Sequence, residues 1–199
     1  GIRDKLVTGV QTCALPISSG AVLSTQPVVA IRDAQGNTVT GDSSTQVTVS
    51  ILSGAGGTLG GTTTVTASSG VATFTNVTLS GVVGTNYVLR FAASGLSSAD
   101  SGNVTVSSGT ATALGIATQP VGGASGAVLS TQPVVAIRDA QGNTVTGDSS
   151  TQVTVSILSG AGGTLGGTTT VTASSGVVTF TNVTLSGVVG TNYVLRFAA

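Results

Sequence analysis

The sequence "TQVTVSIL" at residues 45–52 alternates between polar and apolar side chains, and it predicts a β-strand. Val47, Val49 and Ile51 fall on one face of such a strand, and Thr and Ser between them fall on the other. The sequence "NYVLRFAA" at residues 86–93 shows the same pattern with aromatic and aliphatic side chains. A period of two indicates strands with one face in a core, so we predict an all-β fold.

The composition removes most kinds of chemistry from this chain. It has no His, Glu, Met or Trp, and only 6% of its residues are charged, six of them basic and six acidic. A serine nucleophile would therefore have no evident base, and no basic patch exists to bind phosphates. No apolar run reaches the roughly 18–20 residues that a membrane-spanning helix needs. We expect no catalysis, no cofactor, no nucleic-acid partner and no membrane span in this sequence.

An internal repeat organises the chain. Residues 19–93 recur at residues 125–199, an offset of 106 residues, with a single difference between Ala72 and Val178. This period is too long for one unit of a solenoid and fits one small β-sandwich domain. Such near-identity indicates that both copies have the same role.

Two domains are predicted, at residues 18–108 and 111–199, and both are expected to be incomplete. A strand near Leu114 starts a unit, and a strand carrying Val104 and Val106 ends it. The first domain then lacks its first strand, and the second lacks its last strand. An absent terminal strand leaves a sheet edge open and part of the core uncovered.

One segment inside the repeat breaks the strand pattern. In "TTTVTASSGVATFTNVTL" at residues 62–79, Phe74 is out of phase with Val77 and Leu79. We expect a β-bulge at residues 75–76, because an extra residue there would return all three side chains to the core.

The motif "DAQGN" at residues 33–37, followed by Val39 and Gly41 and repeated at residues 139–143, resembles bacterial immunoglobulin-like repeats. These are the tandem domains of invasin- and intimin-type surface adhesins. The resemblance extends over nearly all of residues 18–199. It implies two tandem immunoglobulin-like β-sandwich domains that form an extracellular, rod-like spacer. It transfers no ligand site, because binding in that family lies in other, terminal domains.

The same motif predicts a tight turn in each copy. Its Asp accepts hydrogen bonds from backbone N–H groups, and its Gly adopts a left-handed conformation. The predicted turn residues are Asp33, Gly36, Asn37, Asp139, Gly142 and Asn143. Calcium binding is the alternative, with Asp33, Asp42, Asp139 and Asp148 as candidate ligands. Calcium takes about six to eight oxygen ligands, so the two aspartates that each copy offers make the turn the better interpretation.

The tyrosines are the remaining candidates for ligand contact. Tyr87 and its copy Tyr193 could each stack on a sugar ring. Their phase with residues such as Leu89 and Phe91 indicates packing in the core or at a corner of the sandwich instead.

The opening segment "GIRDKLVTGVQTCALPI", residues 1–17, contains the only Lys and the only Cys of the chain. It resembles the translation of a common short-read sequencing adapter, with Lys5 and Leu6 at the variable index. It lacks the apolar stretch of a signal peptide. We therefore expect residues 1–17 to be non-native and disordered. Without them the chain has four Arg, five Asp and no Cys.

We expect a structural spacer of a large bacterial adhesin-like protein, located outside the cell or on its surface. Its partners would be neighbouring immunoglobulin-like repeats of the same chain, with any host or surface ligand bound by domains outside this sequence. Two alternatives remain at this point. One is a carbohydrate- or protein-binding immunoglobulin-like module, and the other is an accessory spacer attached to an extracellular enzyme.

Overall fold

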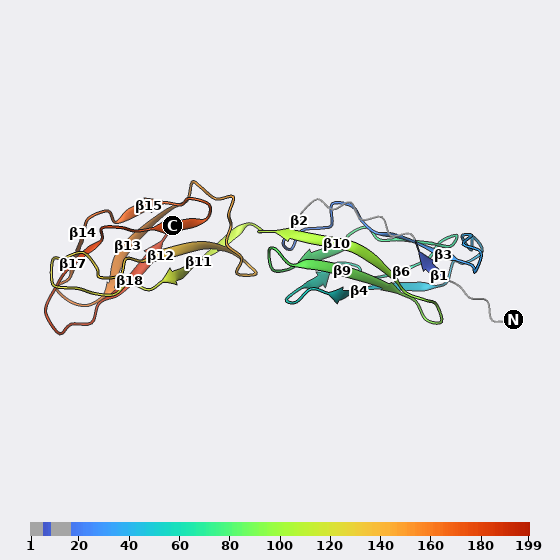
Figure 1. Ribbon diagram of the computed structural model, residues 1–199, viewed down its shortest axis with the longest axis horizontal. Coiled ribbons are helices and arrows are strands. Elements are labelled where there is room, and N and C mark those ends of the chain that lie inside the picture. The colour runs from blue at the N-terminus through green and yellow to red at the C-terminus, as the bar shows by residue number, and fades with distance from the viewer. Residues whose placement is uncertain (1–5, 9–16) are drawn as a thin grey trace. The chain divides into compact units, whose positions relative to one another are not determined.

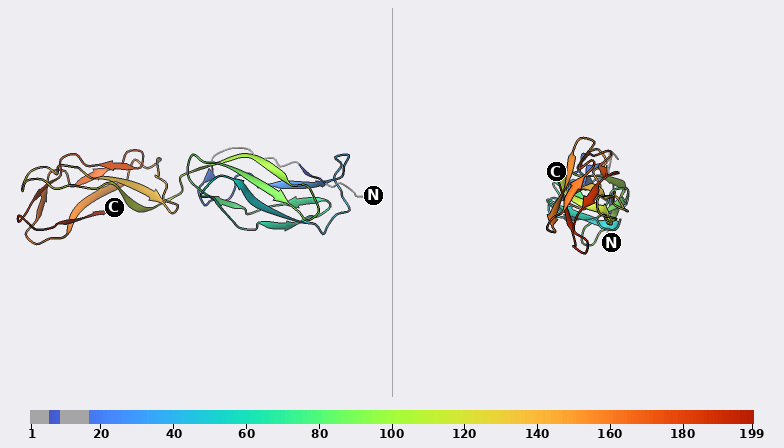
Figure 2. Two further views of the ribbon diagram at one scale, coloured as in Figure 1. Left: turned by 60° about the horizontal axis from the view of Figure 1, so that its bottom comes forward. Right: turned by 90° about the vertical axis from the view of Figure 1, so that its left-hand side faces the viewer.

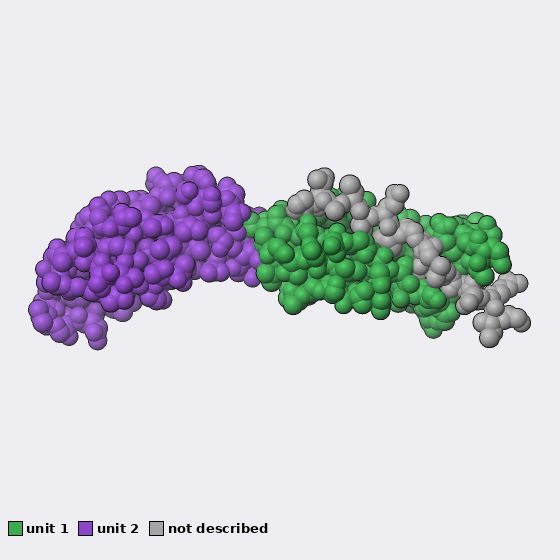
Figure 3. All heavy atoms as spheres, viewed as in Figure 1, with its two compact units in different colours: residues 1–109 green, residues 110–199 purple. Residues whose placement is uncertain are grey.

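The computed structural model describes residues 6–8 and 17–199, and these residues form strands, turns and loops without a helix. The chain divides into two compact units, unit 1 at residues 1–109 and unit 2 at residues 110–199 (Figure 3). The boundary falls between Gly109 and Thr110, the two residues that the predicted domains leave unassigned. The all-β prediction is confirmed.

The strands range from two residues in β2 to nine in β10, and the longest connections between them include residues 33–45 and 119–133 (Figure 1). Those described in unit 1 are β1 (Leu6–Thr8), β2 (Ile17–Ser18), β3 (Val28–Arg32), β4 (Gln46–Ser53), β5 (Thr58–Gly60), β6 (Thr64–Thr66), β7 (Val71–Thr73), β8 (Thr78–Ser80), β9 (Asn86–Ala92) and β10 (Ala99–Ser107). Those of unit 2 are β11 (Ala111–Thr118), β12 (Val134–Asp139), β13 (Gln152–Ser159), β14 (Thr164–Gly166), β15 (Thr170–Thr172), β16 (Val177–Thr179), β17 (Thr184–Ser186) and β18 (Val194–Ala198).

Unit 1 is an immunoglobulin-like β-sandwich (Figures 1 and 2). One sheet has the strand order β1-β3-β7, and the other has the order β2-β10-β9-β4-β6, while β5 pairs with β8 at the side. The inward side chains of both sheets belong to one hydrophobic cluster, which includes Val29 from β3, Val49 from β4 and Phe91 from β9. Polar and apolar residues alternate along β4 because only one of its faces meets that cluster.

Unit 2 repeats this arrangement with fewer strands. Its sheets have the orders β11-β12-β16 and β15-β13-β18, and β14 pairs with β17. Its own core cluster includes Val135, Val155 and Phe180. Phe180 packs at 5.7 Å from Phe197, between ring centres, as Phe74 packs at 5.6 Å from Phe91 in unit 1.

The segment before the repeat contributes strands to unit 1. β1 pairs antiparallel with β3, with Val7 opposite Ile31, as Leu114 of β11 lies opposite Ile137 of β12. β2 pairs in parallel with β10. Because strands pair through backbone N–H and C=O groups, a sequence unrelated to the repeat can occupy an edge.

One prediction is wrong in part. Leu6–Thr8 and Ile17 of the opening segment lie in strands β1 and β2 and are not disordered, and the rest of that segment lies outside the described residues. Residues 18–108 have no first strand of their own beside β3, and β1 takes the place there that β11 takes beside β12. In the part of the chain that is described, β18 pairs only with β13.

The predicted bulge at residues 75–76 is also wrong. β7 pairs with β3, whereas β8 pairs with β5, so the chain leaves one sheet between them and joins another. Phe74, Val77 and Leu79 are all buried, as expected. The change of sheet, rather than a bulge, resolves the conflict in phase.

The missing partner of β18 leads to a first prediction. A copy of residues 94–107 added after Ala199 should raise the melting temperature of unit 2 by at least about 5 °C, which corresponds to about 1 kcal/mol in a domain of this size. The reason is that the added strand would cover the edge of β18 and bury two valines. Scanning calorimetry with and without the extension measures this, and equal melting temperatures would contradict the assignment of the last strand.

A second prediction concerns the opening segment. The side chain of Ile17 is 6% exposed and belongs to the core cluster of unit 1. Ile17→Ala should lower the free energy of unfolding of unit 1 by about 2–4 kcal/mol. Ile116→Ala is the matched control, because Ile116 in β11 is 42% exposed and its truncation should cost under about 0.5 kcal/mol. Urea unfolding followed by hydrogen exchange in each unit compares the two, and equal effects would place Ile17 outside the core.

Candidate functional site

The two copies of the repeat act as an internal control, since β9 and β18 have the same sequence in different surroundings. The inward side chains of β9 are 0% exposed, and their counterparts in β18 are half-buried. The pairs are Tyr87 and Tyr193, Leu89 and Leu195, and Phe91 and Phe197. The difference in burial arises from what lies beside each strand, because the sequence of the strand itself does not change.

In unit 1, β10 covers β9. It pairs antiparallel with β9, with Val104 opposite Tyr87, and its side chains Val104 and Val106 enter the core at 8% and 3% exposure. The register shifts between Asp100 and Asn103, and at this irregularity the hydroxyl of Ser101 accepts the N–H of Leu89 at 2.9 Å. β10 thus provides both the apolar cover and the backbone partners of β9.

An ion pair ties the same two strands together on their outer face. Nε of Arg90 lies 2.7 Å from Oδ1 of Asp100, and Nη2 of Arg90 donates to Oδ2 at 2.8 Å. These hydrogen bonds hold the pKa of the Asp100 carboxyl below its usual value and raise the pKa of Arg90. Both side chains are well exposed to solvent, so the pair selects the register of the strands more than it stabilises them.

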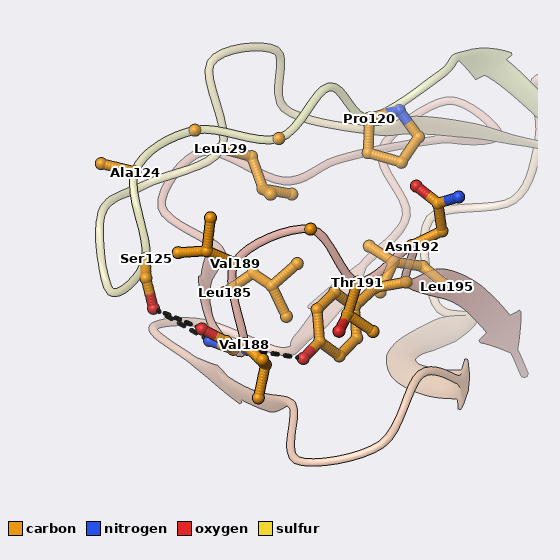
Figure 4. A pocket seen from close by; sticks show the side chains of 15 residues that line it. Pro120, Ala124, Ser125, Leu129, Leu185, Val188, Val189, Thr191, Asn192 and Leu195 are labelled. Atoms are coloured by element: carbon orange, nitrogen blue, oxygen red, sulfur yellow. Dashed lines mark hydrogen bonds between the residues drawn. The ribbon is translucent and has the colours of Figure 1, made fainter.

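In unit 2, a groove occupies the place of β10. It is a cavity of about 500 Å³ between residues 120–125 and residues 187–195, with Leu129 and Leu185 on its floor (Figure 4). By the offset of the repeat, Gly123 stands where Ile17 of β2 stands in unit 1. Unit 2 therefore has neither the valines of the last strand nor an isoleucine to close this side of its sandwich.

A rigid tyrosine forms one wall of the groove. Oη of Tyr193 accepts the N–H of Val188 at 2.9 Å and donates to the carbonyl of Ala161 at 3.1 Å. A Cβ atom at Gly160, Gly163 or Gly187 would collide with the ring, so only glycine fits against it. Because the tyrosine and the backbone fix each other, this wall is formed before any ligand arrives.

Tyr87, the counterpart of Tyr193 in unit 1, was a candidate for stacking on a sugar ring. Oη of Tyr87 accepts the N–H of Val82 at 2.8 Å and donates to the carbonyl of Ala55 at 3.1 Å. The side chain is 0% exposed, so its ring has no free face for a sugar. Sequence reasoning placed this residue in the core or at a corner, but it missed the glycines around the ring. The chain has 30 glycines, so the sequence alone does not show which of them pack against the tyrosine ring.

The DAQGN motif forms a closed hydrogen-bonded turn in each unit. In unit 1, Oδ1 of Asp33 accepts the N–H groups of Gln35 and Asn37 at 3.0 and 2.8 Å, and Gly36 has a φ of 86°. The Nδ2 of Asn37 donates to Oδ2 of Asp33 at 3.3 Å. The backbone hydrogen bond from Asn37 is the main reason that the pKa of Asp33 is lowered.

The second turn has the same geometry and is more deeply buried. Oδ1 of Asp139 accepts the N–H groups of Gln141 and Asn143 at 3.0 and 2.8 Å, Oδ2 accepts Nδ2 of Asn143 at 2.9 Å, and Gly142 has a φ of 82°. Asp139 is 3% exposed. β11 reaches this turn, with Ala111 opposite Asp139, whereas the described part of β1 begins opposite Arg32.

The other two calcium candidates are also engaged within their own loops. Oδ1 of Asp42 accepts the N–H of Thr45 at 3.0 Å and Oδ2 accepts its hydroxyl at 2.7 Å, and Asp148 bonds to Thr151 in the same way at 2.9 and 2.6 Å. The bond from the Thr151 hydroxyl is the largest cause of the lowered pKa of Asp148. Among the residues described, no three of Asp, Glu, His and Cys gather where they could hold a metal ion. The contacts favour turn formation over calcium binding.

The turn leads to a prediction about pH. A folded-state pKa below the usual value of 3.8 means that the stabilisation from Asp33 is fully present above about pH 5 and is lost as the pH falls through the folded-state pKa. Asp33→Asn should therefore flatten the acid side of the stability profile of unit 1. Asp100→Asn removes a different carboxyl whose pKa is also lowered. It should also flatten the acid side of the profile, but without altering hydrogen exchange in the turn. Urea unfolding between pH 2 and pH 7 measures the profiles, and an unchanged acid limb for Asp33→Asn would contradict the role of that carboxylate.

No helix in the described residues is long and apolar enough to cross a membrane. The chain matches no family model, no curated protein and no solved structure.

Proposed function

We propose that this chain is a structural spacer, a stalk segment of a large bacterial cell-surface or secreted adhesin-like protein, without catalysis. The observation that carries the proposal is the repeat itself: residues 19–93 and 125–199 differ at one position, and each copy lies in a unit with its own core. A chain that repeats one β-sandwich gains length with each copy. It gains no new chemistry.

The surface chemistry supports the same proposal. Only 6% of residues are charged, and the outward positions of strands such as β4 and β13 are Thr, Ser and Gln, apart from the exposed Leu52 and Leu158. The turns are closed by their own side chains, since Asp33 and Asp139 bond to N–H groups of their own loops. A spacer needs a surface of this kind, which is soluble and binds its surroundings weakly.

The direct test is how length grows with repeat number. β4 and β13 have eight residues, which at about 3.3 Å per residue span about 26 Å. Arrays of two, four and six intact 106-residue repeats should therefore increase in maximum dimension linearly, by at least about 26 Å per repeat, in small-angle X-ray scattering. Arrays that collapse, so that dimension grows much more slowly than repeat number, would overturn the spacer.

The binding alternative needs a separate measurement. A glycan array and a calcium titration with one intact repeat test it directly, because a single repeat carries every loop of the module. A saturable signal would favour a binding module over a spacer. An accessory spacer beside an extracellular enzyme has the same physical properties as a stalk segment. A catalytic domain encoded upstream or downstream in the same reading frame would identify it.

A further inference from the structure

We propose that the short connection between the two units, residues 108–110, prevents strand exchange between the two copies of the repeat while the chain folds. It joins Ser107, the last residue of β10, to Ala111, the first residue of β11. This is a conformational role for a segment without any side chain in a core. It goes beyond the spacer function and does not depend on it.

The hazard of exchange comes from the repeat. β3 pairs with β7, with Val28 opposite Thr73, and β12 pairs with β16 through the equivalent residues, with Val134 opposite Thr179. The residues of β3 recur in β12, so a mispaired chain could place Val134 opposite Thr73 in the same register. Strand exchange is a characteristic failure of repeat proteins, because local pairing does not distinguish the right copy from the wrong one.

One such exchange would use a continuous part of the chain. Strands β4 to β10 of unit 1 are followed directly by β11 and β12. In a hybrid sandwich built from residues 46–139, β12 would take the place of β3 beside β7, and β11 would take the place of β1. The hybrid would then hold an equivalent of every described strand of unit 1 except the two-residue β2. It is a circular permutation of the native fold.

The direction of the strands opposes this hybrid. In unit 1, β10 ends at Ser107, which lies opposite Ser18 of β2. The described part of β1 begins opposite Arg32, the last residue of β3, toward the other end of the sandwich (Figure 1). To replace β1, β11 would have to begin there too, since Ala111 lies opposite Asp139 at the end of β12. The connection would therefore have to run back along the length of the sandwich.

The connection is too short to cover that distance. β10 has nine residues, which at about 3.3 Å per residue span about 30 Å. Four Cα–Cα steps lead from Ser107 to Ala111, and at about 3.6 Å each they cover at most about 14 Å. The hybrid could form only if β11 gave up its place. That would uncover the edge of β12 and remove Leu114, which packs against the core cluster of unit 2.

The native pairing keeps β11, so the connection makes two otherwise equivalent pairings unequal. A longer connection should remove this difference. Twelve added Gly and Ser residues would bring the root-mean-square reach to about 22 Å and the full extension to over about 50 Å. The entropic cost of closing a loop rises only slowly with its length, so the longer connection should admit the hybrid.

A pair of cysteines reports the exchange in the full chain. Val134→Cys and Thr73→Cys lie opposite each other only when β12 pairs with β7, and directly opposite side chains are close enough for a disulfide. Thr73 is exposed and Val134 is half-buried, so neither substitution opens a cavity in a core. Cys13→Ser in every variant leaves these two as the only thiols.

The measurement is the fraction of monomer that crosslinks after refolding. Each chain is unfolded and reduced in urea, refolded at low concentration and oxidised with glutathione disulfide, and its intact mass is read after alkylation of free thiols. A chain with twelve Gly and Ser residues inserted after Gly109 should crosslink at least about fivefold more than a chain with the original connection, because its hybrid no longer loses the burial of Leu114.

The same twelve residues inserted after Gly84 are the matched control. Gly84 is exposed and has no neighbouring atom within 4 Å of a Cβ position, so this insertion lengthens the chain and leaves the connection unchanged. Its crosslinking should stay at the level of the original chain. A second pair, Val28→Cys with Thr73→Cys, reports the native pairing of β3 with β7 and should crosslink in all three chains.

Equal crosslinking between positions 73 and 134 with the original and the lengthened connection would overturn the proposal, whether both fractions are high or both are undetectable. An equal rise with the insertion after Gly84 would also overturn it, since lengthening at any point would then permit exchange. None of these results bears on how array length grows with repeat number, so this proposal and the spacer proposal fail separately.

Discussion

The cover that one strand gives to the edge of its neighbour is the interaction on which this structure depends. With β10 beside it, β9 is a seven-residue strand whose Tyr, Leu and Phe side chains are fully buried. Without such a neighbour, the same sequence forms the five-residue β18, and the counterparts of Asn86 and Tyr87 fall outside the strand. Strand length, burial and the presence of a groove thus follow from a neighbour and not from the strand's own residues. The physical reason is that backbone groups and apolar side chains at an edge need partners that only another strand supplies.

The predictable part of the fold is the part specified by local pattern. The alternation in residues 45–52 and 86–93 is enough to place Val47, Val49, Leu89 and Phe91 in the core, because a half-buried strand has a period of two. The DAQGN turn is equally local, since one Asp side chain bonds to backbone groups two and four residues further on. Because the sequence repeats, each of these predictions for the first copy applies equally to the second copy.

What sequence reasoning missed depends on contacts between distant residues. The change of sheet after Phe74 depends on which strands β7 and β8 pair with. The periodicity of the sequence does not specify these partners. The strands contributed by Leu6–Thr8 and Ile17 were missed because the opening segment resembles translated adapter sequence and was expected to be disordered. The edge of a sheet, however, can pair with a backbone of almost any sequence. The groove was foreseen only as an open edge. Its tyrosine wall brings Tyr193 against Gly160 and Ala161, which lie more than 30 positions earlier in the sequence.

The parallel pairing of β2 with β10 has a consequence for how unit 1 carries a load. These two strands lie near opposite ends of the unit's sequence, and Val106 and Ser107 face Ile17 and Ser18 along the same direction. The N–H of Ser19 adds a further bond to the carbonyl of Ser107 at 2.9 Å. Tension applied through the two ends pulls such strands past each other along their length, so their hydrogen bonds resist in shear and break together rather than one after another.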